Sequence, residues 1–170
     1  PQYAGMGTTL VVCLYYDNRM LVAHHGDSRL YMLRDGKFSQ VTRDHSLLQE
    51  QIDSGIITPE QAKKAQHKNL VTKALGIDPT VEPEIHEYPT RSGDIYLLSS
   101  DGLCDLVEDE DIAMTLQTLG KGNLKLAAQH LVQMANDNGG RDNVSVILVR
   151  VLREYPGRRG VMGKVFGWLK

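Results

Sequence analysis

Cysteine is scarce in this chain: of its 170 residues, only Cys13 and Cys104 carry a thiol. Two distant cysteines form neither a disulfide framework nor a zinc cluster, so the sequence excludes small domains stabilised in those ways. Cys13 also lies within an apolar run, where a free cysteine usually packs as a small hydrophobic side chain. The cysteine content therefore favours a reducing, cytoplasmic compartment.

Long apolar runs and an excess of one charge are also missing. The longest apolar stretch, residues 10–16, is far shorter than the ~20 residues that a membrane-spanning helix needs. Lys plus Arg number 19 and Asp plus Glu number 21, whereas a dedicated nucleic-acid-binding protein carries a basic stripe. Because 41% of the residues are hydrophobic, the chain can bury a core. We expect one globular domain that binds no nucleic acid.

The first quarter of the chain has the pattern of short strands joined by tight turns. Asp17-Asn18 is a turn signal between two runs rich in β-branched and aromatic residues, and Asp35-Gly36 is a strong hairpin signal. The expected strands are 8–16, 20–25, 29–33 and 37–41. We therefore expect the residues up to 42 to form one antiparallel β meander.

Helical patterns and further strands follow. Residues 45–66 keep apolar side chains at roughly helical spacing, and Thr58-Pro59 provides a cap and a first-turn proline for a helix within them. The other expected helices are 109–119 and 123–135, and the other expected strands are 81–87, 94–99 and 144–151. This order of elements predicts an α+β fold built on antiparallel sheets.

Three short segments place an aspartate near a glycine at the expected end of a strand. They read HGDSR, SSDGL and GGRDN, and they contain Asp27, Asp101 and Asp142. Strand ends are rigid, and a glycine lets a ligand approach the backbone closely. Converging carboxylates without histidine or cysteine favour a hard cation such as Mg²⁺ or Mn²⁺. Taken alone, each segment is more simply explained as a turn, because Asp beside Gly is common there.

The three segments occur in a fixed order with three others. In sequence they are GMGTT at 5–9, GDSR at 26–29, TRDHS at 42–46, LVTKALG at 70–76, SSDGLCD at 99–105 and GGRDNVSVILV at 139–149. In this combination the chain resembles the metal-dependent serine/threonine protein phosphatases of the protein phosphatase 2C family, in their compact bacterial form. GDSR and TRDHS favour this branch over a sporulation-type phosphatase of the same fold. The resemblance implies a sandwich of two antiparallel β-sheets flanked by antiparallel helix pairs, with the catalytic domain at 1–152.

The resemblance also implies the chemistry. Asp101 and Asp142 would be ligands of the first Mg²⁺ or Mn²⁺ of a two-metal site, and Asp27 would join Asp101 at a weaker third site. Residues 46–69 match a flap that shapes substrate access. The implied activity is hydrolysis of phosphoserine or phosphothreonine on proteins by a metal-activated water, in opposition to a serine/threonine kinase.

One departure from the family pattern is informative. Family members carry, before the GMGTT segment, an Asp-Gly motif whose aspartate bridges two metals, whereas this chain begins almost at Gly5. We favour the C-terminal part of a larger phosphatase, and the alternative is a catalytically inactive module that binds phosphoproteins or a kinase. A truncated chain would expose apolar sheet surface and unpaired edges, so we expect it to associate or swap elements with another copy and to bind metal weakly.

Two further features were assigned no catalytic role. His24 and His25 are adjacent on an expected strand and so point to opposite faces, which favours structural roles over a shared metal ion; His45, beside Asp44, is also expected to be structural. The tail, 153–170, is basic and has apolar residues at helical spacing. It predicts a flexible extension or, less simply, an amphipathic helix on an acidic membrane surface or a partner.

Overall fold

The computed structural model describes residues 2, 5–63, 70–77 and 80–155. The end of the predicted flap, 64–69, and residues 156–170 of the predicted tail lie outside the described residues. No helix within the described ranges is long and apolar enough to cross a membrane.

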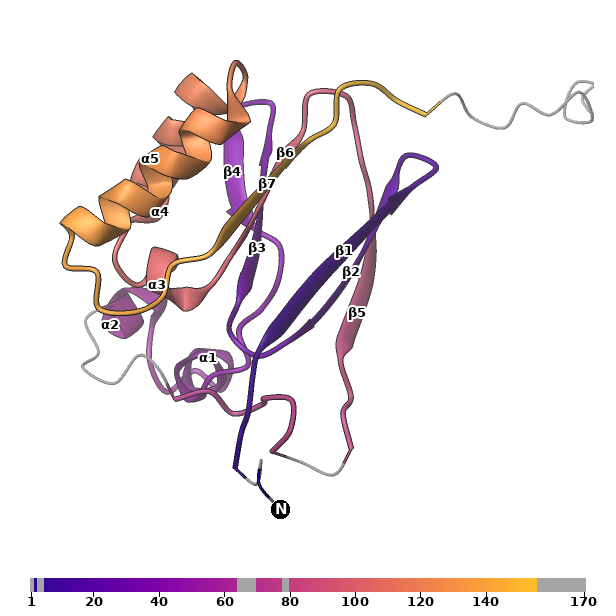
Figure 1. The fold of residues 1–170 in the computed structure, drawn as a ribbon. Helices are drawn as coiled ribbons and strands as arrows, with labels where there is room; N and C mark the ends of the chain where they lie inside the picture. The colour runs from indigo at the N-terminus through magenta and orange to yellow at the C-terminus, as the bar shows by residue number, and fades with distance from the viewer. Residues whose placement is uncertain (1, 3–4, 64–69, 78–79, 156–170) are drawn as a thin grey trace, which may run out of the picture.

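The strands pair antiparallel into two sheets that face each other (Figure 1). The three-stranded sheet has the order β1-β2-β5 and the four-stranded sheet has the order β4-β3-β6-β7. The strands are β1 (Leu10–Tyr16), β2 (Arg19–His25), β3 (Arg29–Arg34), β4 (Lys37–Gln40), β5 (Glu84–Pro89), β6 (Ile95–Ser99) and β7 (Val146–Arg150). The predicted α+β class and its sandwich of antiparallel sheets are confirmed.

The helices fall into two groups. α4 (Asp109–Thr115), the π-helical turn η1 (Leu116–Gly120) and α5 (Leu124–Asp137) cover the outer face of the four-stranded sheet (Figure 1). The others are α1 (Leu47–Asp53), α2 (Pro59–Lys63) and the short α3 (Asp101–Cys104). α5 begins at a side-chain cap, since Asn123 accepts a hydrogen bond from the Leu126 N–H at 3.1 Å.

The core has two layers that share strand β6, which is buried along its whole length. Ile95 and Leu97 pack with Leu131 of α5 in the layer between sheet and helices. On the other face of β6, Tyr96 and Leu98 pack with Met20 and Val22 of β2 in the layer between the sheets. Burying each such side chain stabilises the fold by about 1.5–3 kcal/mol. Because β6 contributes side chains to both layers, it joins the two halves of the core.

The two predicted hairpin turns are confirmed. Asp17 and Asn18 have φ values of 42° and 62°, and Asp35 and Gly36 have 51° and 80°. Positive φ at both central residues defines a type I′ turn, whose twist matches that of the flanking strands.

The prediction of one β meander is wrong, because β2 does not pair with β3. β2 pairs with β1 and β5, and the chain then crosses to the other sheet, where β3 pairs with β4 and β6. Gly26 makes the crossing with φ of 114°, and a Cβ there would lie 2.4 Å from Cγ2 of Thr9. The crossing therefore requires glycine, and it places Asp27 at the junction of the two sheets.

The outer face of the three-stranded sheet is exposed and largely apolar, apart from the ion pair of Arg19 and Glu87 at 2.6 Å. β1 is an edge strand, and alternate side chains on this face, Leu10, Val12, Leu14 and Tyr16, are 38–58% exposed. Ile85 of β5 lies on the same face and is 55% exposed. Among the described residues, no helix covers this face, in contrast to the outer face of the four-stranded sheet (Figure 1).

We expect the chain to self-associate through this face, because edge strands with apolar exposed side chains pair or stack with other copies. Light scattering should give a mass above the 19.0 kDa of one chain. The double substitution Val12→Lys/Leu14→Lys should return the mass to that of a monomer. Leu126→Lys, at an exposed leucine of α5, is the matched control and should leave the association intact. A wild-type monomer at high concentration would refute this expectation.

A buried ion pair joins the end of β3 to the start of β6, at the end of the sandwich opposite the β2–β3 crossing. Arg34 of β3 donates to both carboxylate oxygens of Asp94, at 2.8 and 2.7 Å, and the Arg91 N–H donates at 2.7 Å. The Asp94 side chain is only 2% exposed. Burial alone raises the pKa of Asp94, but the bonds from Arg34 and Arg91 outweigh it, so this pKa lies below its usual value.

Asp94→Asn should lower the free energy of unfolding by about 2–3 kcal/mol at pH 7, because Arg34 loses its charged partner but stays partly solvated. A depressed folded-state pKa stabilises the fold above the pKa of the unfolded chain. The difference between wild type and variant should therefore shrink as the pH falls below ~4. Urea unfolding measures it, and Asp35→Asn, at an exposed turn residue, is the control. A difference that grows in acid would contradict this assignment.

Candidate metal centre

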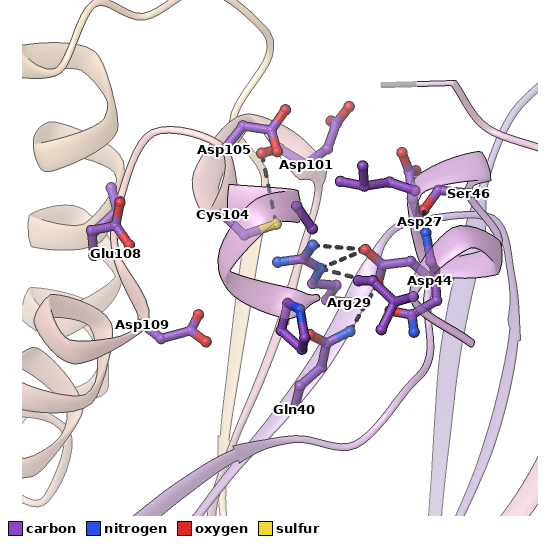
Figure 2. Close-up of a pocket in the computed structure, with 16 residues that line it drawn as sticks. Asp27, Arg29, Gln40, Asp44, Ser46, Asp101, Cys104, Asp105, Glu108 and Asp109 are labelled. Carbon is purple, nitrogen blue, oxygen red and sulfur yellow. Dashed lines mark hydrogen bonds and ion pairs between the residues drawn. The ribbon is translucent and has the colours of Figure 1, made fainter. Parts of the chain in front are cut away.

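Asp27 and Asp101 face the same cavity, which has a volume of about 220 Å³ (Figure 2). α1 and the start of α2 form one wall, and α3 and the start of α4 form the other. Apolar side chains of the first wall are Leu48, Ile52, Pro59 and Ala62. The structure thus brings together two of the three aspartates that the sequence singled out, although they lie 74 positions apart by their numbers.

The Asp27 side chain lies in a buried position that disfavours its ionised form. Asp27 is 9% exposed. Burial, as the larger cause, and the negative charge of Asp101 together raise its pKa to about 6. These two carboxylates repel each other in a partly buried cavity, and a divalent cation would relieve that repulsion. Their oxygen donors are also the type that Mg²⁺ and Mn²⁺ prefer, so the residues fit a hard cation.

Asp101 is positioned by α3, an element that the sequence analysis did not predict. It is the first residue of α3, and its Oδ1 accepts a hydrogen bond from the Gly102 N–H at 2.8 Å. Gly102 packs directly on the chain at Asn143, since a Cβ there would lie 2.5 Å from the Asn143 carbonyl oxygen. A four-residue helix has too little periodicity to be found by pattern; Ser100 before Asp101, in the position of a helix cap, was the available signal.

Ser100 binds the loop that carries Asp142. The Ser100 N–H donates to the Ser145 carbonyl at 3.1 Å, the Ser145 N–H donates to Ser100 Oγ at 3.0 Å, and that hydroxyl donates to the Asn143 carbonyl at 3.0 Å. The backbone next to Asp142 therefore lies against α3. However, the Asp142 side chain is exposed, accepts the Asn143 N–H at 2.6 Å, and is not among the described residues that line the cavity.

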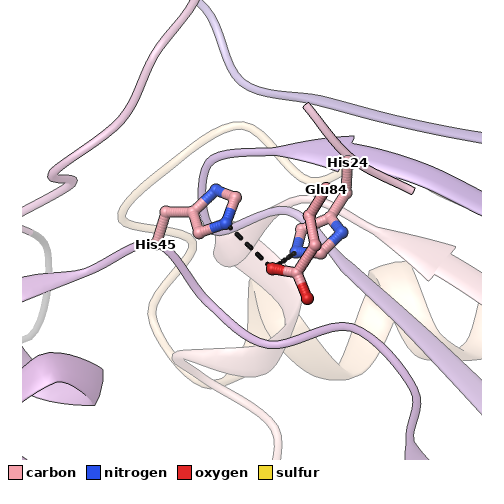
Figure 3. Close-up of side chains that lie close together, drawn as sticks. All are labelled: His24, His45 and Glu84. Carbon is pink, nitrogen blue, oxygen red and sulfur yellow. Dashed lines mark hydrogen bonds and ion pairs between the residues drawn. The ribbon is translucent and has the colours of Figure 1, made fainter. Parts of the chain in front are cut away.

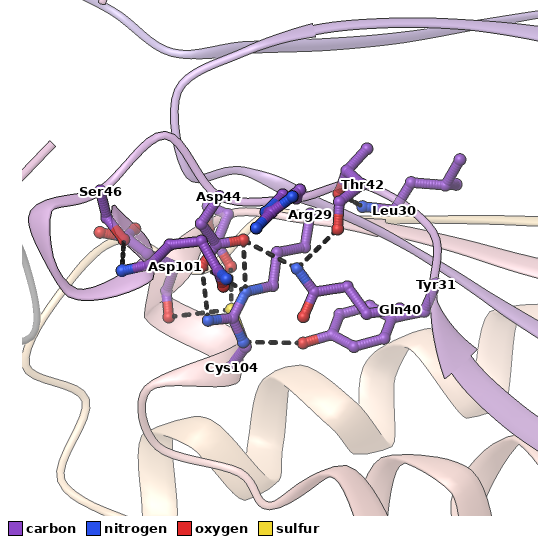
Figure 4. Close-up of polar contacts among 12 residues, drawn as sticks. Arg29, Leu30, Tyr31, Gln40, Thr42, Asp44, Ser46, Asp101 and Cys104 are labelled. Carbon is purple, nitrogen blue, oxygen red and sulfur yellow. Dashed lines mark hydrogen bonds and ion pairs between the residues drawn. The ribbon is translucent and has the colours of Figure 1, made fainter. Parts of the chain in front are cut away.

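A bidentate ion pair forms the floor of the cavity (Figure 4). Arg29 donates through Nε and Nη2 to Asp44, with the shortest contact 2.7 Å, and through Nη1 to the Tyr31 hydroxyl at 3.0 Å. Gln40 adds a bond to Asp44 at 2.8 Å. Among the described lining residues, Arg29 is the one basic side chain, and its charge is already matched by Asp44. The other acidic lining residues are Asp27, Asp101, Asp105, Glu108 and Asp109.

A second group of potential metal ligands lies next to Gly26, the residue at which the chain crosses between the sheets (Figure 3). Within the described residues, the set of three whose ligand atoms all lie within 4.8 Å of one another is His24, His45 and Glu84; Asp27, Asp101 and Asp142 do not form such a set. His25 is not a member of this set, although its ring lies 5.7 Å from the His45 ring, with 66° between the planes. Burial lowers the pKa of His45 despite the Glu84 carboxylate, so its ring is neutral near pH 7.

Two family profiles match the chain. Protein phosphatase 2C matches residues 3–51, and stage II sporulation protein E (SpoIIE) matches residues 30–152. The serine/threonine protein phosphatase PstP of Mycobacterium tuberculosis is 42% identical over 152 residues, which are 89% of this chain and 29% of PstP. The chain belongs to the protein phosphatase 2C type of serine/threonine phosphatases.

Other relatives agree with this family assignment. Protein phosphatase PhpP of Streptococcus pneumoniae is 38% identical over 154 residues, which are 89% of this chain and 61% of PhpP. The crystal structure of the PstP catalytic domain with two manganese ions has a TM-score of 0.78 at 42% identity, over 88% of this chain and 60% of that one. The resemblance seen in the sequence is confirmed, and the chain spans less than two thirds of these relatives.

Gly102→Ala should separate α3 from the loop that carries Asp142, because the added methyl group meets the Asn143 carbonyl. Overpacking of this kind costs about 1–3 kcal/mol, and we expect a matching decrease in the free energy of unfolding. Gly122→Ala is the control, since the nearest atom to a Cβ there is 3.8 Å away. Chemical denaturation of both variants measures the difference. Equal stability of the two would show that the close approach at Gly102 is unimportant.

Proposed function

We propose that this chain serves the Mg²⁺- or Mn²⁺-dependent hydrolysis of phosphoserine and phosphothreonine on cytoplasmic proteins, in opposition to a serine/threonine kinase. The observation that carries the proposal is the pair of carboxylates, Asp27 and Asp101, that face one cavity without a free basic partner among the described lining residues. The two manganese ions of the PstP structure support it. Cys13 and Cys104, both free, fit a reducing compartment.

Each aspartate has a role in this proposal. Asp27 and Asp101 would hold a cation at the cavity, and Asp142 would join Asp101 through the loop that Ser100 holds. When bound, the cations supply a water that is nucleophilic at neutral pH and neutralise charge on the phosphoryl oxygens. No side-chain nucleophile is needed, and burial raises the pKa of Cys104 to about 11, so that its thiol stays protonated.

The walls of the cavity suit a protein substrate better than a small phosphate ester. Leu48 and Ile52 of α1 and Pro59 of α2 offer apolar contacts next to the acidic centre. A phosphorylated peptide can place its phosphate at the carboxylates with bound cations and pack a neighbouring side chain on this wall. The part of the flap at 46–63 would thus contribute to substrate binding.

A second candidate function is a phosphatase-like module that binds phosphoproteins or a kinase without hydrolysis. Its support is the position of Asp142, whose exposed carboxylate lies outside the set of residues that line the cavity. Three carboxylates that do not converge make a weak site. Measurements of Mn²⁺ binding and of phosphate release discriminate between the two functions.

Calorimetry should show that Mn²⁺ binds this chain with a dissociation constant in the micromolar range or weaker, and that Asp101→Asn weakens the binding at least about tenfold, because one of few charged ligands is lost. Glu110→Gln, an exposed acid of α4 outside the cavity, is the matched control. Phosphate release from a phosphothreonine peptide should require Mn²⁺ and should fail in Asp101→Asn.

The outcomes separate the candidates. Mn²⁺-dependent release that Asp101→Asn abolishes supports the hydrolase. Peptide binding without release in the wild type favours the binding module. Mn²⁺ affinity that is unchanged in Asp101→Asn and Asp27→Asn would contradict the proposed ligands.

A further inference from the structure

His45 is bonded to both polar groups of the Gly26 backbone. The Gly26 N–H donates to Nδ1 of His45 at 3.0 Å, and the His45 N–H donates to the Gly26 carbonyl at 3.0 Å. Gly26 is the residue of the crossing between the sheets, and Asp27 follows it directly. His45 therefore holds the backbone from which the Asp27 carboxylate extends into the cavity.

The hydrogen bonds fix the position of the ring proton on His45. A backbone N–H can only donate, so Nδ1 must present its lone pair, and the neutral ring carries its proton on Nε2. Nε2 lies 3.2 Å from Oε2 of Glu84, which accepts that proton in a hydrogen bond (Figure 3). Glu84 stands on β5, directly opposite His24 of β2 in the sheet register.

The surroundings keep this arrangement in place. The His24 ring stacks on the His45 ring at 4.8 Å between centroids and 11° between planes, and its Nε2 donates to the Arg43 carbonyl at 2.8 Å. The His45 carbonyl accepts the Thr72 N–H at 2.9 Å. The His24 and His45 side chains are 1% and 10% exposed, so neither ring is free to reorient.

We propose that His45 and Glu84 are a positioning dyad, in which Glu84 orients the His45 ring and the ring holds Gly26 so that Asp27 faces the metal cavity. The inference rests on the proposed function, because the ligand role of Asp27 belongs to it. The dyad acts through Gly26 and touches neither cation nor substrate. Substitution of a residue that supports a metal ligand from outside the coordination shell typically lowers metal affinity by about 10- to 100-fold.

A metal ion held by His24, His45 and Glu84 is the competing explanation of the same cluster. The ring nitrogens that face Glu84 are the two Nε2 atoms, 3.8 and 3.2 Å from its Oε2, and each already carries the proton that it donates. Moving the His45 proton to Nδ1 would place it against the Gly26 N–H. A cation here would therefore break the hydrogen bonds that hold the crossing.

The test combines two measurements on the full chain: amide hydrogen exchange at Gly26 and Asp27 without metal, and Mn²⁺ affinity by calorimetry. His45→Ala should speed exchange at Gly26 about tenfold and lower Mn²⁺ affinity by about 10- to 100-fold. His45→Asn, whose Oδ1 can lie where Nδ1 lies, should restore most of both. Glu84→Ala should give part of the loss, and Glu82→Ala, an exposed neighbour in sequence, should give none.

Each result decides the question. Loss in His45→Ala with rescue in His45→Asn supports the dyad, since a merely structural defect would not be rescued by an acceptor oxygen alone. Unchanged exchange at Gly26, or faster exchange with unchanged Mn²⁺ affinity, overturns it. A wild-type chain that binds no Mn²⁺ refutes the proposed function, and the dyad with it. Zn²⁺ binding that survives Asp27→Asn but is lost in His45→Ala would assign the cluster to a metal instead.

Discussion

An excess of negative charge in one cavity is the constraint on which the rest of this site depends. Asp27 and Asp101 meet at the end of the sandwich, while the Arg29 guanidinium is already bound to Asp44. Burial and, to a smaller extent, the charge of Asp101 disfavour the ionised form of Asp27, and both raise its pKa. Under the proposed function a bound cation would balance this charge, and carboxylates with a raised pKa in a cavity are typical of functional sites.

The architecture places the three proposed ligands on three connections at one end of the sheets. The β2–β3 crossing carries Asp27, the β6–α3 turn carries Asp101, and the loop before β7 carries Asp142. Glycine is required at two close contacts of these segments: Gly26 lies against Thr9, which precedes β1, and Gly102 lies against Asn143 in the loop before β7. β6, buried on both faces, anchors the assembly. These connections can position side chains because close contacts hold their backbone in place.

The sequence allowed local features to be predicted well and long-range ones poorly. The type I′ turns at Asp17-Asn18 and Asp35-Gly36 depend on residues that tolerate positive φ, which a sequence shows directly. The prediction of one meander was wrong because turn residues do not indicate which sheet a strand joins. The crossing at Gly26, packed against Thr9, takes β3 into the other sheet. Glu84 could not be linked to His45 from the sequence, since the β2–β5 register places Glu84 opposite His24 and the His45 ring stacks on His24. The family motifs supplied Asp27 and Asp101, whereas the exposed position of Asp142 required the structure.

The central claim is that a divalent cation binds between Asp27 and Asp101. Anomalous diffraction at the manganese edge, from crystals of this chain grown with Mn²⁺, tests it most directly. We predict an anomalous peak in the cavity within coordination distance of both carboxylates. A peak between His24, His45 and Glu84, or none in the cavity at saturating Mn²⁺, would contradict it.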